Sequence, residues 1–141
     1  MTIALTKVAY TTAASSKGAR SGHVTSADGV VDLDLAQPGT FTGEPKANPE
    51  TLFAAGYSAC FQGALANRAK TLDIDTSDST VTAEVSFGPS EDGGFGLAVE
   101  LKVEIPGVDR ETAQKLIELA HEFCPYSKAT RNNIEVTLTV V

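Results

Sequence analysis

The distribution of hydrophobic and polar residues in the first third of the chain predicts a short strand, a hairpin and a loop. Residues 5–11 have the character of a short strand. Residues 23–36 predict a hairpin, because Asp28 and Gly29 form a favoured turn dipeptide and the apolar residues after it alternate with aspartates. Residues 37–49 are punctuated by Pro and Gly, so we expect a loop there.

A long helix is predicted after this loop, from Pro49 to about Lys70. Asn48 is a favourable N-cap residue, and proline suits the first helical position. Apolar residues point to every side of this helix, so it must be buried on every side. We infer a homodimer in which two such helices bury each other; the alternative is a helix wrapped by its own chain. The apolar residues are Leu52, Phe53, Ala54, Ala55, Gly56, Tyr57, Ala59, Phe61, Ala64 and Leu65.

The second half of the chain predicts two strands, an amphipathic helix and a final strand. Residues 79–87 and 94–105 alternate as the strands of a hairpin. Asp109 is placed to cap the helix, and residues 133–141 close the chain as a strand. This order predicts an α+β fold with a mainly antiparallel sheet. The apolar face of the second helix consists of Ala113, Leu116, Ile117, Ala120 and Phe123.

Length, composition and charge narrow the class of protein. A length of 141 residues favours one domain over residues 1–141. The formal net charge is -7 and no basic cluster interrupts the acidity, so nucleic acid and anionic membrane surfaces are not expected partners. The first residues lack the pattern of a signal peptide, and no run of apolar residues is long enough to span a bilayer. We expect a cytoplasmic protein.

The two cysteines are the candidate chemical groups. Cys60 lies inside the apolar helix, and Cys124 shares the apolar face of the second helix, so the two could meet in the core. Two thiols brought together can alternate between dithiol and disulfide. Apolar surroundings raise the pKa of a thiol, and Cys60 is roughly 15 Å from the helix N-terminus, so a reactive thiolate would need another cation. The alternative is a pair of inert core cysteines.

The arginines and histidines offer few partners for such a thiolate. Arg20 lies in a Gly/Ser-rich segment that could carry a guanidinium inward, although a solvated arginine is the simpler interpretation. A buried guanidinium would need a carboxylate, and Glu50 in the first turn of the apolar helix could approach Cys60 of a second chain. His121 is expected on the solvated side of its helix. A zinc site would require His23, Cys60, His121 and Cys124, whose spacing is unlike that of known sites, so no metal is expected.

Two long motifs identify a family. Residues 48–61, NPETLFAAGYSACF, and residues 124–140, CPYSKATRNNIEVTLTV, closely resemble the organic hydroperoxide resistance proteins, the Ohr branch of the Ohr/OsmC family. Residues 18–29, GARSGHVTSADG, resemble the early arginine loop of that family. The resemblance implies four site residues: Cys60 as the peroxidatic cysteine, Cys124 as the resolving cysteine, Arg20 as the cation that holds the thiolate, and Glu50 as the carboxylate that orients the arginine.

The resemblance also implies an OsmC-like fold, an intertwined homodimer and a peroxidase activity on organic hydroperoxides, including those of fatty acids. Lipoylated proteins or dihydrolipoamide would be the reductant, and no cofactor would be bound. Side chains expected to line the site for an alkyl chain, each of which could instead be core, are Phe53, Tyr57, Phe61 and Tyr126. Two other activities stay open: a redox-sensing or hydrophobic-ligand-binding protein without turnover, and a general thiol–disulfide oxidoreductase.

Overall fold

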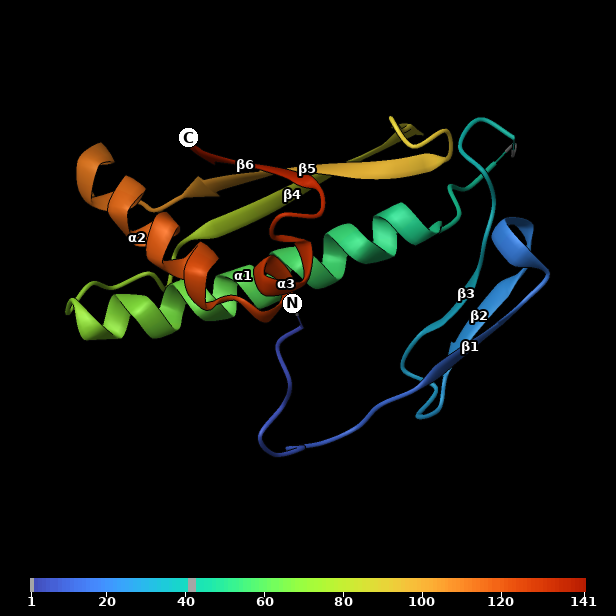
Figure 1. Cartoon of the computed structure of the whole chain (residues 1–141), viewed down its shortest axis with the longest axis horizontal. Coiled ribbons are helices and arrows are strands. Elements are labelled where there is room, and N and C mark those ends of the chain that lie inside the picture. Colours follow the sequence, from blue (N-terminus) through green and yellow to red (C-terminus); the bar gives the residue numbers. More distant parts are fainter. Residues whose placement is uncertain (1, 41–42) are drawn as a thin grey trace. The chain divides into compact units, whose positions relative to one another are not determined.

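The chain forms two compact units, and the boundary between them lies at the start of the long helix α1, Pro49–Thr71 (Figure 1). The computed structural model describes residues 2–40 and 43–141. They belong to an N-terminal unit that ends at Pro49 and a C-terminal unit, Glu50–Val141. A single domain over residues 1–141 stays a prediction. The elements are β1 (Ala14–Lys17), the 3₁₀ helix η1 (Ala19–Ser21), β2 (His23–Ser26), β3 (Asp32–Asp34), α1 (Pro49–Thr71), β4 (Thr80–Pro89), β5 (Phe95–Glu104), α2 (Arg110–Phe123), α3 (Pro125–Thr130) and β6 (Glu135–Val140).

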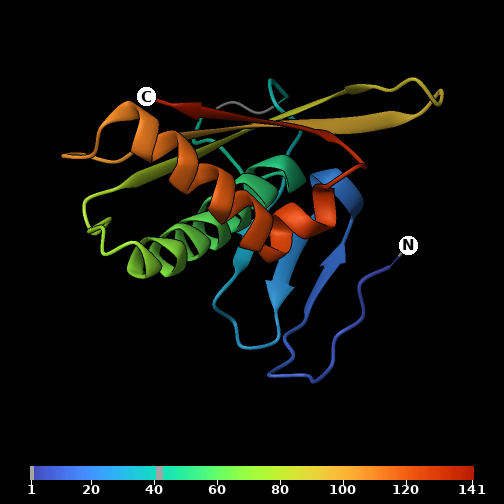
Figure 2. The ribbon, with the colours of Figure 1, turned by 60° about the vertical axis from the view of Figure 1, so that its left-hand side comes forward.

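The C-terminal unit is a three-stranded sheet with its helices on one face. The strand order is β4-β5-β6, and α1, α2 and α3 lie on the same side of this sheet in both views (Figures 1 and 2). β4 and β5 form the predicted antiparallel hairpin. β6 pairs with β5 in parallel, because the intervening helices carry the chain back across the sheet before the last strand begins. The predicted α+β class is confirmed.

The core of this unit forms where the predicted apolar faces meet. Val99, Leu101 and Val103 alternate along β5 and are buried, in agreement with the period of two in the sequence. Phe123 was expected to join the buried face of α2 but is 41% exposed. It stands at the end of the helix, where the guanidinium of Arg68 lies over its ring at 4.3 Å. The buried residues of α2 are Ala113, Leu116, Ile117 and Ala120.

Only one side of α1 is buried against the rest of the C-terminal unit. The helix begins at Pro49, as predicted, and ends at Thr71. Its opposite side carries small residues that this unit leaves exposed, so the C-terminal unit by itself does not wrap the helix. No helix in residues 2–40 and 43–141 has the length and apolar character needed to cross a bilayer. The buried residues of α1 are Tyr57, Phe61, Ala64, Leu65 and Ala69, and the exposed small ones are Ala55, Ala59, Gly63 and Ala66.

The N-terminal unit contains an antiparallel sheet in the order β1-β2-β3. The prediction of a strand over residues 5–11 is wrong, since the first strand begins only at Ala14. The apolar side chains of that segment, Leu5, Val8 and Tyr10, are 79%, 61% and 84% exposed. A strand needs a neighbour to pair its backbone groups, and no strand in residues 2–40 and 43–141 pairs with residues 5–11.

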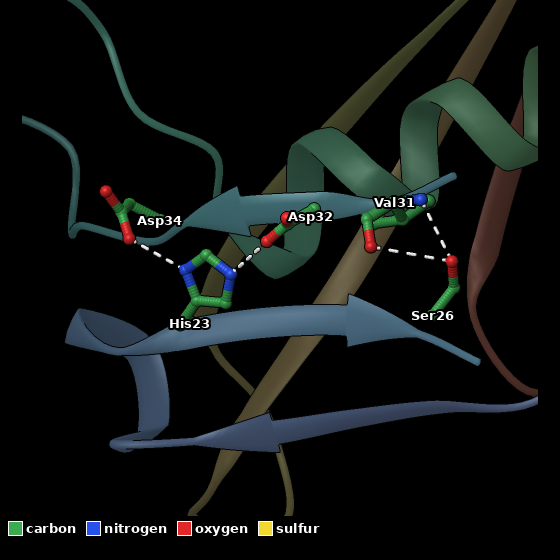
Figure 3. A network of polar contacts seen from close by, with 5 residues as sticks. All are labelled: His23, Ser26, Val31, Asp32 and Asp34. Carbon is green, nitrogen blue, oxygen red and sulfur yellow. Dashed lines mark hydrogen bonds and ion pairs between the residues drawn. The ribbon is translucent and has the colours of Figure 1, made fainter. Parts of the chain in front are cut away.

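The hairpin predicted for residues 23–36 is present as β2 and β3, joined by a turn that contains Gly29 at a φ of 76°. Figure 3 shows the ring of His23 on β2 between two carboxylates of β3. His23 Nδ1 contacts Asp34 Oδ1 at 2.7 Å, and Nε2 bonds Asp32. The predicted loop after the hairpin contains no helix or strand in its described part, residues 37–40 and 43–48; Phe41 and Thr42 lie outside the described residues.

Candidate active site

The two cysteine sulfurs lie together, although 64 positions separate them in sequence. The thiol of Cys124 donates a weak hydrogen bond to Cys60 Sγ across 3.5 Å, and both thiols are free. Cys60 is partly exposed on α1, whereas Cys124 is fully buried. Cys124 ends α2 and precedes α3 with an extended backbone, because Pro125 cannot continue the first helix but suits the first position of the next.

The surroundings of Cys60 oppose its ionisation. Burial raises the pKa of its thiol above the ordinary value, a hydrogen bond from the backbone N–H of Tyr126 lowers it, and the adjacent Cys124 sulfur adds to the rise. Tyr126 is the second residue of α3, so its N–H has no acceptor within the helix and is available to the sulfur. The net pKa is raised, so a stable thiolate needs a further positive group.

Three aromatic rings gather between α1, which carries Cys60, and α3, whose Tyr126 N–H bonds to the Cys60 sulfur. Phe53 meets Tyr57 edge to face with ring centroids 5.8 Å apart, and Tyr126 lies 6.3 Å from Phe53 and 5.8 Å from Tyr57. Gly56 makes this approach possible, because a Cβ there would come within 3.0 Å of the Tyr126 hydroxyl. Phe53 and Tyr126 are partly exposed, while Tyr57 is fully buried. Phe61 is a fully buried member of the hydrophobic core.

A buried polar chain links α1, α2 and α3 next to the cysteines. The Tyr57 hydroxyl contacts Ser127 Oγ at 2.9 Å and Thr130 Oγ1 at 3.1 Å. His121 Nδ1 lies 2.8 Å from Ser127 Oγ. The prediction that His121 faces solvent is therefore wrong, because its ring is half-buried and hydrogen-bonded to Ser127. The sequence offered one signal for this chain of contacts, because Ser127 and Thr130 follow Cys124 at helical spacing.

The other two predicted site residues are Arg20 and Glu50. Arg20 is part of η1 in the N-terminal unit, and Glu50 lies in the first turn of α1. Their roles beside Cys60 stay predictions. Within residues 2–40 and 43–141, no group of three or more His, Cys, Asp or Glu side chains is arranged to hold a metal ion.

The geometry supports reversible disulfide chemistry. A disulfide requires a sulfur–sulfur distance of about 2.05 Å, so sulfurs that start 3.5 Å apart need to approach by only about 1.5 Å. Because the helix break lies at Cys124 itself, a small rotation of this residue could supply that movement. The site is therefore suited to a cycle between dithiol and disulfide.

Comparison with known proteins adds independent findings. The family model described as OsmC-like protein matches residues 41–139. The organic hydroperoxide resistance protein OhrB of Bacillus subtilis is 50% identical over 131 residues, which are 92% of this chain and 96% of that protein. Its crystal structure covers 95% of this chain and all of its own, with a TM-score of 0.90 and 48% identity. An organic hydroperoxide resistance protein from Elizabethkingia anophelis, with crystallant-derived thiocyanate bound, has a TM-score of 0.86 and 54% identity, and covers 95% of this chain and 97% of its own.

Proposed function

Because this chain belongs to the OsmC-like family, in its organic hydroperoxide resistance branch, we propose that it is a thiol peroxidase that reduces organic hydroperoxides to alcohols. One observation carries the proposal. Cys60 Sγ, partly exposed, has a buried partner sulfur 3.5 Å away, and the residue whose N–H bonds to it, Tyr126, packs its ring with those of Phe53 and Tyr57. A nucleophile, a second thiol that can form a disulfide with it, and apolar surface for an organic substrate are the parts that such a reaction needs.

In the first step, the Cys60 thiolate attacks the outer oxygen of the hydroperoxide. The O–O bond breaks, the inner oxygen takes a proton and leaves as an alcohol, and Cys60 becomes a sulfenic acid. The Tyr126 N–H, which hydrogen bonds to the sulfur, would stabilise its negative charge before the attack.

In the second step, the Cys124 thiol attacks the sulfenic sulfur. A sulfur–sulfur bond forms, the S–O bond breaks, and the hydroxyl leaves as water. An external dithiol then reduces the disulfide by exchange, and we propose that lipoyl groups serve as that dithiol. A cycle through free thiols needs a compartment that keeps thiols reduced, and the proposal therefore includes the cytoplasm.

The raised pKa of Cys60 supports a role for an imported cation. We propose that the Arg20 guanidinium supplies it, with Glu50 holding the guanidinium in place. Arginine suits this role because it stays charged and can donate hydrogen bonds to both the thiolate and the peroxide oxygens. Phe53 and Tyr126 are partly exposed and would contact the alkyl part of a substrate, which hydrogen peroxide lacks.

The proposal includes a homodimer. The exposed small residues on α1, Ala55, Ala59 and Gly63, would allow the backbone of a second helix to approach closely. The exposed apolar residues before β1 would gain a neighbour if they paired with a second chain. Sedimentation or light scattering on the reduced protein tests this part, and a monomer at micromolar concentration would contradict it.

Steady-state turnover of cumene hydroperoxide with dihydrolipoamide tests the activity. We expect continuous consumption by the native protein and none by Cys60→Ser. Cys124→Ser should still form a sulfenic acid at Cys60, detected by mass spectrometry after dimedone trapping, but no disulfide. A single burst without turnover would instead favour a redox sensor, and equal inertness of both variants would mean that the cysteine roles are wrong.

A further inference from the structure

We propose that His121, Ser127, Tyr57 and Thr130 form a positioning network that holds α3 against α1 and thereby sets how fast the Cys60 sulfenic acid becomes a disulfide. The inference rests on the proposed function, because it concerns the second step of that cycle. None of these four side chains is assigned to the chemistry itself. Their contribution is to keep Cys124 Sγ and the Tyr126 N–H directed at Cys60 Sγ.

The first argument is the attachment of α3. This helix has six residues, from Pro125 to Thr130, and no side-chain hydrogen bond at its N-cap. Its buried residues are Ser127 and Thr130, both hydroxyl-bearing. An ordinary surface helix is anchored by an apolar stripe, but α3 is anchored on its buried side through hydrogen bonds to the Tyr57 hydroxyl. Loss of those bonds would therefore loosen α3 far more than the loss of two hydrogen bonds would loosen α1, which is held by buried apolar side chains.

The second argument is the spacing from the sulfurs. Tyr57 precedes Cys60 by three residues on α1, and Ser127 follows Cys124 by three residues. Residues three apart lie on the same side of a helix, about 4.5 Å along its axis. The Tyr57–Ser127 contact of 2.9 Å thus runs alongside the sulfur–sulfur contact of 3.5 Å, one helical turn away. This hydrogen bond therefore limits the distance between the segment that carries Cys60 and the segment that carries Cys124.

The third argument is a proton count. Thr130 donates its hydroxyl proton to the Ser127 carbonyl at 3.1 Å, so in its contact with Tyr57 it accepts. Tyr57 then donates to Thr130 and accepts from Ser127. The single hydroxyl proton of Ser127 is used in its bond to Tyr57, so Ser127 Oγ can only accept a hydrogen bond from His121. All four bonds form together only if His121 carries its proton on Nδ1.

His121 is therefore the terminal donor of the network and fixes the direction of every hydrogen bond in it. Either the neutral Nδ1–H form or the imidazolium satisfies Ser127. Burial and the nearby Arg131 lower the pKa of His121, so the neutral form prevails near neutral pH. Two charged groups act on the His121 ring: Arg131 lowers its pKa and Glu122 raises it.

The test measures the disulfide step separately from the peroxide step. The reduced protein is mixed with one equivalent of cumene hydroperoxide, quenched at intervals with dimedone, and analysed by mass spectrometry for sulfenic acid and disulfide. Each of the variants Ser127→Ala and Tyr57→Phe removes two side-chain hydrogen bonds of the network. We expect both to slow disulfide formation at least about tenfold, the factor that one buried hydrogen bond of ordinary strength would already account for. Both variants should also show a higher Cys60 pKa in a thiolate titration at 240 nm, because the Tyr126 N–H moves away.

Ile117→Val is the matched control. It removes a methyl group from the core beneath α2 and lowers stability without touching the network. We expect its disulfide step and its Cys60 titration to match those of the native protein. If Ser127→Ala and Tyr57→Phe both keep the native rate, or if Ile117→Val is slowed equally, the inference is overturned while the proposed function stands. If the native protein itself forms no disulfide, the proposed function fails first.

The role of His121 has its own readout. Nitrogen-15 spectra of the ring should show the Nδ1–H tautomer in the native protein at neutral pH. His121→Asn retains a donor close to the position of Nδ1 and should restore most of the native disulfide rate, whereas His121→Leu should be as slow as Ser127→Ala. An Nε2–H tautomer, or equal rates for the two variants, would overturn the assignment of His121 as the donor.

Discussion

Each unit of the molecule is stabilised internally by a different kind of interaction. In the C-terminal unit, apolar faces of β5, α1 and α2 meet in one buried core. Among the described residues of the N-terminal unit, Leu35 and Ala36 are the apolar residues buried to a similar degree. That unit depends instead on strand pairing and on exposed side-chain bonds, such as those of His23 with its two aspartates and of Ser26 with Asp28 (Figure 3).

This difference matches the division of work in the proposed mechanism. The two sulfurs, whose separation has to be controlled closely, belong to the unit whose packing is tight. The arginine proposed to assist them belongs to the unit with little core of its own. A cation on a loosely packed segment can adjust when the sulfur changes from thiolate to sulfenic acid and then to disulfide, while the core limits the movement of the sulfurs to the short approach that the disulfide needs.

The largest expected effect separates the two kinds of stability. Leu101→Ala, in the core of the C-terminal unit, should lower the free energy of unfolding by about 2 to 5 kcal/mol, because it leaves a cavity under the helices. Leu33→Ala, at a position 39% exposed on β3, should cost less than about 1 kcal/mol. Urea denaturation followed by circular dichroism at equal protein concentrations measures both, and equal losses would contradict the comparison.

A somewhat smaller effect tests whether the N-terminal unit contributes to the chemistry. Arg20→Ala should raise the Cys60 pKa and lower the rate of peroxide reduction on the order of 10²-fold, since one charged donor to the reacting group is lost. Arg110→Ala is the matched control, because its guanidinium donates to the Val140 carbonyl at 3.2 Å. Stopped-flow kinetics and thiolate titration compare the two variants, and an unchanged titration in Arg20→Ala would exclude Arg20 as the partner.

The smallest effect concerns pH and the hydrogen-bonded hairpin. Bonding to Asp34, and then to Asp32, raises the pKa of His23 above its ordinary value of 6.5. A raised pKa means that the folded hairpin holds the proton more tightly, so its contribution is complete below 6.5 and is lost as pH rises through the folded value. Hydrogen exchange, corrected for the intrinsic pH dependence, should show protection of β2 and β3 falling as pH rises above 6.5, while that of β4 and β5 stays constant.

The charged groups around His23 are Asp32 and Asp34, which bond to its ring, Lys17, which pairs with it in register on β1, and Lys46, which acts on Asp34. Its hydrogen bond with His23 lowers the pKa of Asp34, so this carboxylate stays ionised where the histidine titrates. His23→Asn should therefore abolish the pH dependence. If protection of the hairpin in this variant still falls with pH, the histidine is not its cause.

The helices and the long hairpin were predictable because local patterns match their burial. Pro49 and Asp109 mark the starts of α1 and α2, and the alternation in residues 94–105 matches the buried side of β5. The strand over residues 5–11 was not predictable in this way. Apolar residues there resemble a strand, but a strand exists only with a neighbour, and a single sequence does not state which segment pairs with which.

By itself, the sequence determined the two candidate sulfurs, the helix that carries Cys60, the break at Pro125 and the family to which the chain belongs. Tertiary structure alone decided that Cys124 Sγ lies 3.5 Å from Cys60 Sγ, that β6 runs parallel to β5, and that His121 turns inward to Ser127. The physical reason is the distance along the chain over which each kind of interaction acts. Propensity and periodicity act over a few neighbouring residues, whereas these contacts join positions far apart in the chain or depend on which of several faces packing leaves free.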